Sequence, residues 1–300
     1  MNETIEQRHC GYCAIVGRPN VGKSTLLNRL IGEKLAITSD KPQTTRHSII
    51  GVKTRAEGQI VYVDTPGLHQ RGEQAMNRYL NQTAASVLHD VDLQLFVVEA
   101  LKWGDEDEAV LSRIIASSRP AILVVNKVDR IRDKRRLLPF LADLSRRHSF
   151  AEVIPVSAQS GDNLVALEER VVQLLPVGEN YYPDDQLTDR SERFFAAELI
   201  REQLTRRYAQ EIPYSLSVEI EKFEEQPGMN RISALIWVER EGQKNIIIGK
   251  KGAALKEAAQ QARKEMERMY GKKVFLELWV KVKKSWSSDE KALLSLGYGD

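Results

Sequence analysis

Residues 17–24 read Gly17-Arg18-Pro19-Asn20-Val21-Gly22-Lys23-Ser24 and match the pattern G-x-x-x-x-G-K-[ST]. An apolar run, Tyr12–Val16, precedes the motif, and a helix-length stretch, Lys23–Ile31, follows it. In that strand–loop–helix context the loop wraps backbone N–H groups around phosphate oxygens, and the helix N-terminus adds about half a positive charge. Lys23 supplies a mobile cation, and the Ser24 hydroxyl can bind Mg²⁺. The sequence therefore predicts a P-loop that binds a nucleotide.

The chain around the P-loop alternates short apolar runs with helical stretches up to about residue 175. The runs are rich in Val and Ile and are continuous rather than alternating, which is typical of strands buried on both faces of a parallel sheet. We expect an α/β fold with a mainly parallel sheet and an edge hairpin from two runs, 47–53 and 59–63. The expected parallel strands are Tyr12–Val16, Gln59–Val63, Leu93–Val98, Ala121–Val125 and Val153–Val156.

A second α+β region follows a stretch rich in turn residues, 176–192. Its pattern predicts a helix over 191–208, strands at 215–222 and 231–239, a glycine-bearing turn, a helix over 253–270 and a strand over 274–282. The expected element order is α-β-β-(α)-α-β, with the bracketed helix short. We therefore expect two domains with boundaries at 1–178 and 193–300, joined by a linker at 179–192.

Two motifs at strand ends complete the expected site for a guanine nucleotide and its metal ion. Asp64-Thr65-Pro66-Gly67 follows Gln59–Val63. We expect Asp64 to hold Mg²⁺ through water, with Gly67 offering its N–H to a terminal phosphate. Asn126-Lys127-Val128-Asp129 follows Ala121–Val125. A carboxylate at Asp129 accepts two parallel hydrogen bonds from guanine and none from adenine, and such pairing discriminates by about 10⁴–10⁵.

Other residues extend this site. We expect Asn126 to tie its loop to the P-loop, Lys127 to cover the base plane, and Ser157-Ala158 to offer a backbone N–H to the guanine carbonyl. The expected metal ligands are Ser24, Thr45 and Asp64, with Thr45 favoured over Thr44, and the expected catalytic residues are Lys23, Thr45 and Gly67. The candidate nucleotide-binding residues are Gly17, Arg18, Pro19, Asn20, Val21, Gly22, Lys23, Ser24, Thr25, Asp64, Thr65, Pro66, Gly67, Leu68, Asn126, Lys127, Asp129, Ser157 and Ala158.

The residues after Gly67 predict slow hydrolysis. No glutamine is available there to orient the attacking water. Leu68 is apolar, and His69 is either a bystander or the group that orients the water. The Asn20 amide oxygen, inside the P-loop, can help bind a monovalent cation beside the phosphates, so we expect K⁺ to accelerate hydrolysis more than Na⁺.

A G-x-x-G loop marks the second region as an RNA-binding domain. The stretch Ile246–Lys256 contains two glycines with Lys250 and Lys251 between them, and such loops clamp about four nucleotides in KH domains. Residues 244–284 hold 12 basic and 4 acidic residues. Trp279 and Trp286 either stack on bases or belong to the core or rim. The candidate RNA-binding residues are Ile248, Gly249, Lys250, Lys251, Gly252 and Lys256.

Composition excludes several classes of protein. The 300 residues carry a net charge of +2 and are 42% hydrophobic, so disorder along the whole chain is excluded. Two cysteines, Cys10 and Cys13, are too few for a disulfide framework, and we expect them to be inert in a reducing cytosol. No signal peptide and no membrane-spanning stretch is expected.

With both regions considered, the chain resembles the Era family of bacterial GTPases with a C-terminal KH domain. The matching elements are residues 17–25, 42–46, 64–67, 126–129, 181–185 and 246–252. The resemblance implies a Ras-like G domain, a type II KH domain, GTP or GDP with Mg²⁺, and binding to the 3′ end of 16S ribosomal RNA during 30S subunit assembly and 16S rRNA processing. It also implies a cytoplasmic protein that associates peripherally with the inner face of the cell membrane. We expect a monomer that does not bind DNA.

Two other functions remain open at this stage. A P-loop small-molecule kinase would share residues 17–24 but has no need of the motif at 126–129. An RNA-binding protein with vestigial GTP hydrolysis would have no need of intact Lys23, Ser24 and Asp64.

Overall fold

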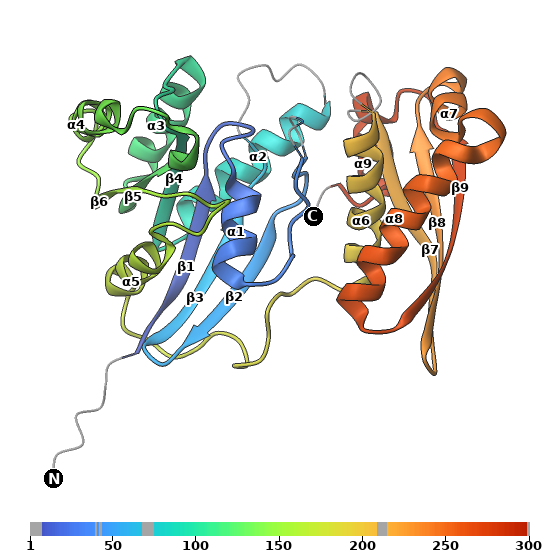
Figure 1. The fold of residues 1–300 in the computed structure, drawn as a ribbon, viewed down its shortest axis with the longest axis horizontal. Helices are drawn as coiled ribbons and strands as arrows, with labels where there is room; N and C mark the ends of the chain where they lie inside the picture. The colour runs from blue at the N-terminus through green and yellow to red at the C-terminus, as the bar shows by residue number, and fades with distance from the viewer. Residues whose placement is uncertain (1–7, 40, 42–43, 68–74, 209–214, 299–300) are drawn as a thin grey trace, which may run out of the picture. The chain divides into compact units, whose positions relative to one another are not determined.

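The computed structural model describes residues 8–39, 41, 44–67, 75–208 and 215–298 (Figure 1). Two compact units form: of the described residues, the first takes in 8–36, 45–67 and 80–189, and the second takes in 37–39, 41, 44, 75–79, 190–208 and 215–298. Within the described ranges, no helix combines the length and the apolar character that crossing a bilayer requires.

The first unit is built on a six-stranded sheet in the order β2-β3-β1-β4-β5-β6. Only β2 runs antiparallel to its neighbour, β3, and all the other pairs are parallel. The predicted parallel sheet and its edge hairpin are therefore confirmed. The strands are β1 (His9–Val16), β2 (Ile49–Arg55), β3 (Gly58–Asp64), β4 (Leu93–Glu99), β5 (Ala121–Asn126) and β6 (Glu152–Pro155).

Helices cover both faces of this sheet. Every residue of β3, β4 and β5 is buried, which explains why these strands read as continuous apolar runs. α1 and α5 contact β1 and β3, whereas α2, α3 and α4 contribute to a core beneath β1, β4 and β5. The helices are α1 (Lys23–Ile31), α2 (Ala75–Asp90), α3 (Asp105–Ser117), α4 (Leu137–Ser145) and α5 (Leu164–Leu174), with short 3₁₀ turns η1 (Val128–Arg130) and η2 (Lys134–Arg136) before α4.

The segment expected as a linker is held against the first unit over part of its length. The Gln59 side chain donates to the carbonyl of Tyr182 and accepts the N–H groups of Tyr181 and Tyr182, at 2.9–3.0 Å. The Val52 N–H donates to the Leu187 carbonyl at 2.8 Å. Turn-rich composition indicated a break between helices, but it could not indicate that the chain follows the sheet edge there.

The second unit is an α+β domain with the predicted element order α-β-β-α-α-β, followed by a short helix. Its sheet has the order β7-β8-β9, antiparallel between β7 and β8 and parallel between β8 and β9. α6, α7 and α8 contribute to the core on one face of this sheet. The elements are α6 (Glu192–Arg207), β7 (Leu216–Gln226), β8 (Met229–Val238), α7 (Glu241–Ile248), η4 (Lys250–Gly252), α8 (Ala253–Tyr270), β9 (Lys273–Val282), η5 (Trp286–Ser288) and α9 (Glu290–Ser295).

Candidate functional site

The P-loop connects β1 to α1 and packs tightly against its neighbours. Gly22 has φ 104°, and a Cβ there would lie 2.4 Å from Asn126 Nδ2. A Cβ on Gly67 would lie 2.9 Å from Pro19 Cγ. Glycine is therefore required where the loop meets Asn126, and Gly67 lies directly against the P-loop, as its expected role at a terminal phosphate requires.

Lys23 is buried at the first position of α1 and bonds to its own loop. Its Nζ donates to the carbonyls of Gly17 and Arg18, at 3.0 and 3.1 Å. Burial, opposed by the charge of Asp64, lowers the pKa of Lys23 to about 8. Negative phosphate oxygens would favour the ammonium form, so this side chain is suited to exchange the two carbonyls for an anion.

Three oxygen-bearing side chains meet at the start of α1. Ser24 Oγ donates to Asp64 Oδ2 at 2.8 Å, and the hydroxyls of Ser24 and Thr45 lie 2.8 Å apart. Asp64 is fully buried, its Oδ1 has no hydrogen-bond partner among the described residues, and burial raises its pKa to about 6. A buried carboxylate oxygen without a partner, beside two hydroxyls, fits a hard cation such as Mg²⁺.

The choice between the two threonines follows from this cluster. Thr45 Oγ1 lies 3.5 Å from Asp64 Oδ2 as well as beside Ser24. Thr44 instead donates its hydroxyl to the Lys41 carbonyl at 2.6 Å. Thr45 is therefore the threonine that the structure brings to the candidate metal site.

Asn126 joins three loops of the first unit. Its Nδ2 donates to the Val21 carbonyl at 2.8 Å, and its Oδ1 accepts the N–H groups of Lys127 at 2.8 Å and Ala158 at 3.0 Å. The side chain is 2% exposed. The P-loop, the loop after β5 and the loop after β6 therefore share one buried amide.

The expected base-recognition residues lie close together at the ends of β5 and β6. Asp129 Oδ1 accepts the Ser157 hydroxyl at 2.6 Å, and Ser157 Oγ accepts the Ser160 N–H at 3.1 Å. The Asp129 carboxylate is therefore oriented by a neighbouring loop. The Ala158 N–H already donates to Asn126, so its expected contact with a guanine carbonyl stays a prediction.

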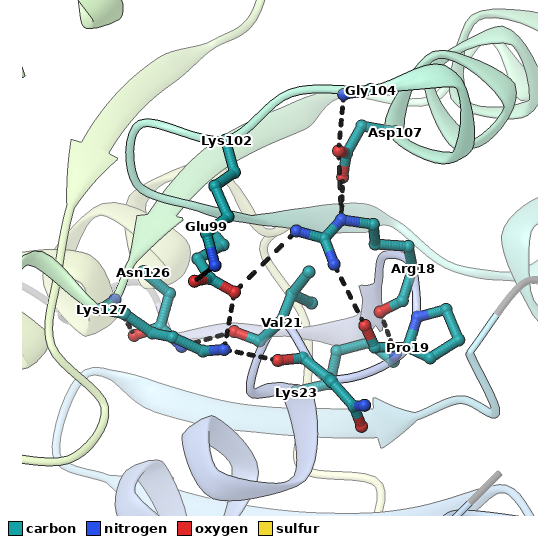
Figure 2. A network of polar contacts seen from close by, with 11 residues as sticks. Arg18, Pro19, Val21, Lys23, Glu99, Lys102, Gly104, Asp107, Asn126 and Lys127 are labelled. Atoms are coloured by element: carbon teal, nitrogen blue, oxygen red, sulfur yellow. Dashed lines mark hydrogen bonds and ion pairs between the residues drawn. The ribbon is translucent and has the colours of Figure 1, made fainter. Parts of the chain in front are cut away.

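An ionic network that the sequence motifs did not indicate surrounds the P-loop (Figure 2). Lys127 Nζ donates to the Asn20 carbonyl at 2.6 Å and to Glu99 Oε2 at 2.8 Å. Glu99 also lies 2.6 Å from Lys102 and 3.9 Å from Arg18. Burial raises the pKa of Glu99, but the hydrogen bonds from Lys102 and Lys127 outweigh it and leave that pKa below its usual value. Glu99 thereby links Lys127, in the loop after β5, to Arg18 of the P-loop.

Arg18 completes this network on the side of α3. Its Nε lies 3.1 Å from both carboxylate oxygens of Asp107, which also accepts the Gly104 N–H at 3.1 Å. Asp107 is 1% exposed, and burial, only partly offset by Arg18, raises its pKa. Glu99, an acidic residue at the end of β4, was a sequence signal for this network. Its pairing with Lys127 and the pairing of Asp107 with Arg18 depend on the fold, because the partners are distant in the chain.

The G-x-x-G loop of the second unit has the backbone that its glycines predict. Gly249 and Gly252 have φ 69° and 78°, and Lys251 between them has φ 52°. Lys250, Lys251 and Lys256 are exposed and have no ion pair within the described ranges. Ile248 precedes the loop at the end of α7. These lysines can approach phosphates from the start of α8.

The sequence also singled out residues beyond these two sites. Of these, Leu68 and His69 lie outside the described residues. Trp286 is fully buried and stacks on Tyr298, with ring centroids 6.0 Å apart, so it belongs to the core. Cys10 and Cys13 are both buried and free, and burial raises the pKa of Cys13, which disfavours the reactive thiolate.

The first unit combines a lysine-bearing phosphate loop, an oxygen cluster for a cation and an aspartate held for a base. This geometry defines a GTP-binding protein of the P-loop class, and the second unit has the loop and element order of a KH domain. Family models agree: one described as a 50S ribosome-binding GTPase matches residues 12–127, and a KH domain model matches residues 211–287.

Full-length relatives narrow this class to one family. The chain is 57% identical to GTPase Era of Pseudomonas aeruginosa (strain PAO1) over 291 residues, 97% of this chain and 95% of that protein. It is 55% identical to GTPase Era of Pseudomonas fluorescens (strain Pf0-1) over 300 residues, all of both chains. The chain therefore belongs to the Era family of GTPases.

Solved structures share the fold over nearly the whole chain. An Aquifex aeolicus Era variant bound to GDP and AlF₄⁻ is 38% identical, with a TM-score of 0.94 over 97% of this chain and all of that one. A structure of Era with MgGDPNP and nucleotides 1506–1542 of 16S ribosomal RNA is 38% identical, with a TM-score of 0.95 over 98% of this chain and all of that one.

Proposed function

We propose that this GTPase is a switch whose KH domain binds the 3′ end of 16S ribosomal RNA, and that it acts in 16S rRNA processing and assembly of the 30S subunit. The observation that carries the proposal is the presence, in one chain, of the oxygen cluster around Asp64 and the exposed lysines of the G-x-x-G loop. The similar Era structure that holds both MgGDPNP and a 16S rRNA segment supports the pairing of these two ligands.

In this proposal, the first unit grips the nucleotide through its own side chains. Ser24, Thr45 and Asp64 hold Mg²⁺, which supplies positive charge to the phosphates. Lys23 leaves the carbonyls of Gly17 and Arg18 and donates to phosphate oxygens. The remaining loop residues named from the sequence surround the phosphates, and Asp129 accepts hydrogen bonds from the guanine edge.

In this proposal, the protein detects the terminal phosphate through two contacts, the Thr45 hydroxyl and the Gly67 N–H. Both can be made only while that phosphate is present, so hydrolysis releases them. Lys23, Thr45 and Gly67 would act as the catalytic groups. Since Leu68 stands where a water-orienting glutamine would be needed, unaided hydrolysis should be slow.

We further propose that K⁺ binds beside Asn20 and accelerates hydrolysis. Asn20 has φ 64°, which places it in a turn of the P-loop, and its carbonyl is held by Lys127. Phosphate release should be faster in KCl than in NaCl at equal ionic strength. Equal rates in the two salts would remove the proposed cation.

The two sites should be positively coupled, with the RNA-binding arrangement favoured when GTP is bound. The boundaries in this proposal remain a G domain at 1–178, a linker at 179–192 and a KH domain at 193–300. We propose a cytoplasmic monomer that binds the 30S subunit and no DNA. Peripheral association with the inner face of the cell membrane rests on the family resemblance alone.

The test is binding of a fluorescent RNA covering nucleotides 1506–1542 of 16S rRNA to the full chain loaded with GDP or with a non-hydrolysable GTP analogue. Binding should be tighter with the analogue and should weaken in the double variant Lys250→Gln, Lys251→Gln. Identical affinity with both nucleotides would contradict the coupling. No binding in either state would contradict the RNA-binding proposal.

A further inference from the structure

The sheet of the second unit exposes large aromatic side chains on the face that its helices leave uncovered. Along β9, Val274, Leu276 and Leu278 contact the core with the helices, so the alternate residues face away. Trp279 is 60% exposed and Phe275 is 43% exposed on that outward side. Large apolar side chains exposed beside one another on a well-packed sheet indicate a binding surface.

Cations accompany these rings. The Arg231 guanidinium lies 4.9 Å from the ring centroid of Phe275, its partner across β8 and β9. The Nζ atoms of Lys281 and Lys283 each lie 5.9 Å from the ring centroid of Trp237. We call Trp237, Phe275 and Trp279 with Arg231, Lys281 and Lys283 the aromatic face.

Cations and carboxylates share this side of the sheet: Lys281 Nζ lies 4.0 Å from a carboxylate oxygen of Glu221, and Glu224 lies opposite Arg231 across β7 and β8. Glu219 accepts the indole N–H of Trp237 at 2.8 Å, and Glu277 accepts the Ser233 hydroxyl at 3.3 Å. Arg231 and Lys283 make no ion pair within the described ranges. Residues 272–284 contain five lysines and one glutamate. A polyanion would supply the negative charge that complements Arg231 and Lys283.

We propose that the aromatic face is a second RNA-binding surface, which takes single-stranded RNA by stacking bases on Trp279 and Phe275. Exposed rings flanked by cations are the combination with which proteins bind single strands, because every base has a face to stack and every nucleotide has a phosphate. Four residues along a strand separate the two rings by about 13 Å, so each ring takes its own base. The inference rests on the RNA-binding function proposed for this domain.

This surface is separate from the G-x-x-G loop. The loop joins α7 to α8, and both helices contribute to the core on the inner face of the sheet. The aromatic face lies on the other side. RNA contacts at the two places should therefore contribute independently, and variants of one should leave the other intact.

The experiment measures binding of the full chain to fluorescent oligouridylate, since stacking tolerates any base sequence. Trp279→Ala should weaken binding about tenfold, because one stacked base is lost, whereas Trp279→Phe should keep most of the affinity. Lys283→Gln should lower the slope of log K against log salt by about 0.7. Leu138→Ala, which changes a side chain of α4 that is 74% exposed, is the matched control and should change nothing.

The decisive comparison repeats Trp279→Ala in the Lys250→Gln, Lys251→Gln background. A decrease in RNA affinity by the same factor in that background supports a second surface. Oligouridylate binding that depends only on Lys250 and Lys251 overturns this inference and leaves the proposed function standing. Equal losses in Trp279→Ala and Trp279→Phe with a lowered Tm would also overturn it, because they would indicate a packing role. No RNA binding by the unmodified chain would instead refute the proposed function.

Discussion

Replacing Asn126 by alanine should loosen the whole nucleotide site, because one buried amide serves three loops. The change removes the donor to the Val21 carbonyl and the acceptor for the N–H groups of Lys127 and Ala158. Each lost hydrogen bond costs about 1 kcal/mol net, so the free energy of unfolding should fall by about 3 kcal/mol. For a domain of this size that corresponds to a decrease in Tm of about 6–12 °C.

Nucleotide binding should weaken as well, since the P-loop and the loop after β5 would no longer be held together. We expect GDP to dissociate at least about tenfold faster, equivalent to about 1.4 kcal/mol of lost binding free energy. Stopped-flow displacement of a fluorescent GDP measures this rate, and thermal melting of the nucleotide-free chain measures stability. Asn163→Gly is the matched control, because it removes a single exposed hydrogen bond, from the Asn163 side-chain amide to the Pro155 carbonyl, at a residue with φ 60°. An Asn126→Ala protein that matched this control in both assays would refute the reasoning.

Three further predictions concern the nucleotide site and the G-x-x-G loop. Asp64→Asn should raise the free energy of unfolding of the nucleotide-free chain by about 1–3 kcal/mol at neutral pH. The pKa of Asp64 in the folded chain is about 6, above its value in the unfolded chain. The protonated carboxyl of Asp64 therefore stabilises the fold at low pH, and this contribution is lost as pH rises through 6. Denaturation at pH 5 and pH 8 should show a smaller gain at the lower pH, and the variant should lose Mg²⁺-dependent GTP affinity; an equal or negative change at pH 8 would contradict the assignment. Asp129→Asn should shift binding from guanine to xanthine nucleotides, because the amide donates where the C2 carbonyl of xanthine accepts; competition assays showing unchanged selectivity would count against Asp129 as the base selector. Lys250→Gln with Lys251→Gln should weaken binding of the 1506–1542 RNA segment and lower its salt slope by about 1.4, since each single-strand phosphate contact contributes about 0.7; an unchanged slope would show that these lysines do not meet phosphates.

Much of the fold could be predicted because its signals are local. The continuous apolar runs of β4 and β5 reflect burial on both faces, and the alternation of β9 reflects one face on the core. The edge pairing of β2 with β3 followed from adjacency in the chain. The path of residues 179–189 along the sheet edge could not be predicted, because it depends on Gln59, a polar residue whose partners lie about 120 residues away.

The site shows the same division. Glycine spacing and strand ends indicated the P-loop, Asp64 and Asn126, since each motif carries its own geometry. The roles of Glu99 and Asp107 in holding Lys127 and Arg18 could not be predicted, because carboxylates of this kind are common and only the fold brings them to the P-loop. The alternation of β9 places Trp279 on the outer face, whereas Trp286 lies beyond the strand, and its burial depends on packing against Tyr298.

The central claim is that the first unit recognises guanine and detects the terminal phosphate. Calorimetric titration of nucleotide-free protein with Mg²⁺ and, in turn, GDP, a non-hydrolysable GTP analogue and ATP tests it most directly. We expect one site for each guanine nucleotide, a different enthalpy for the two as Thr45 and Gly67 engage, and no heat with ATP. Binding of ATP as tight as that of GDP, or no heat with any of the three, would contradict the account.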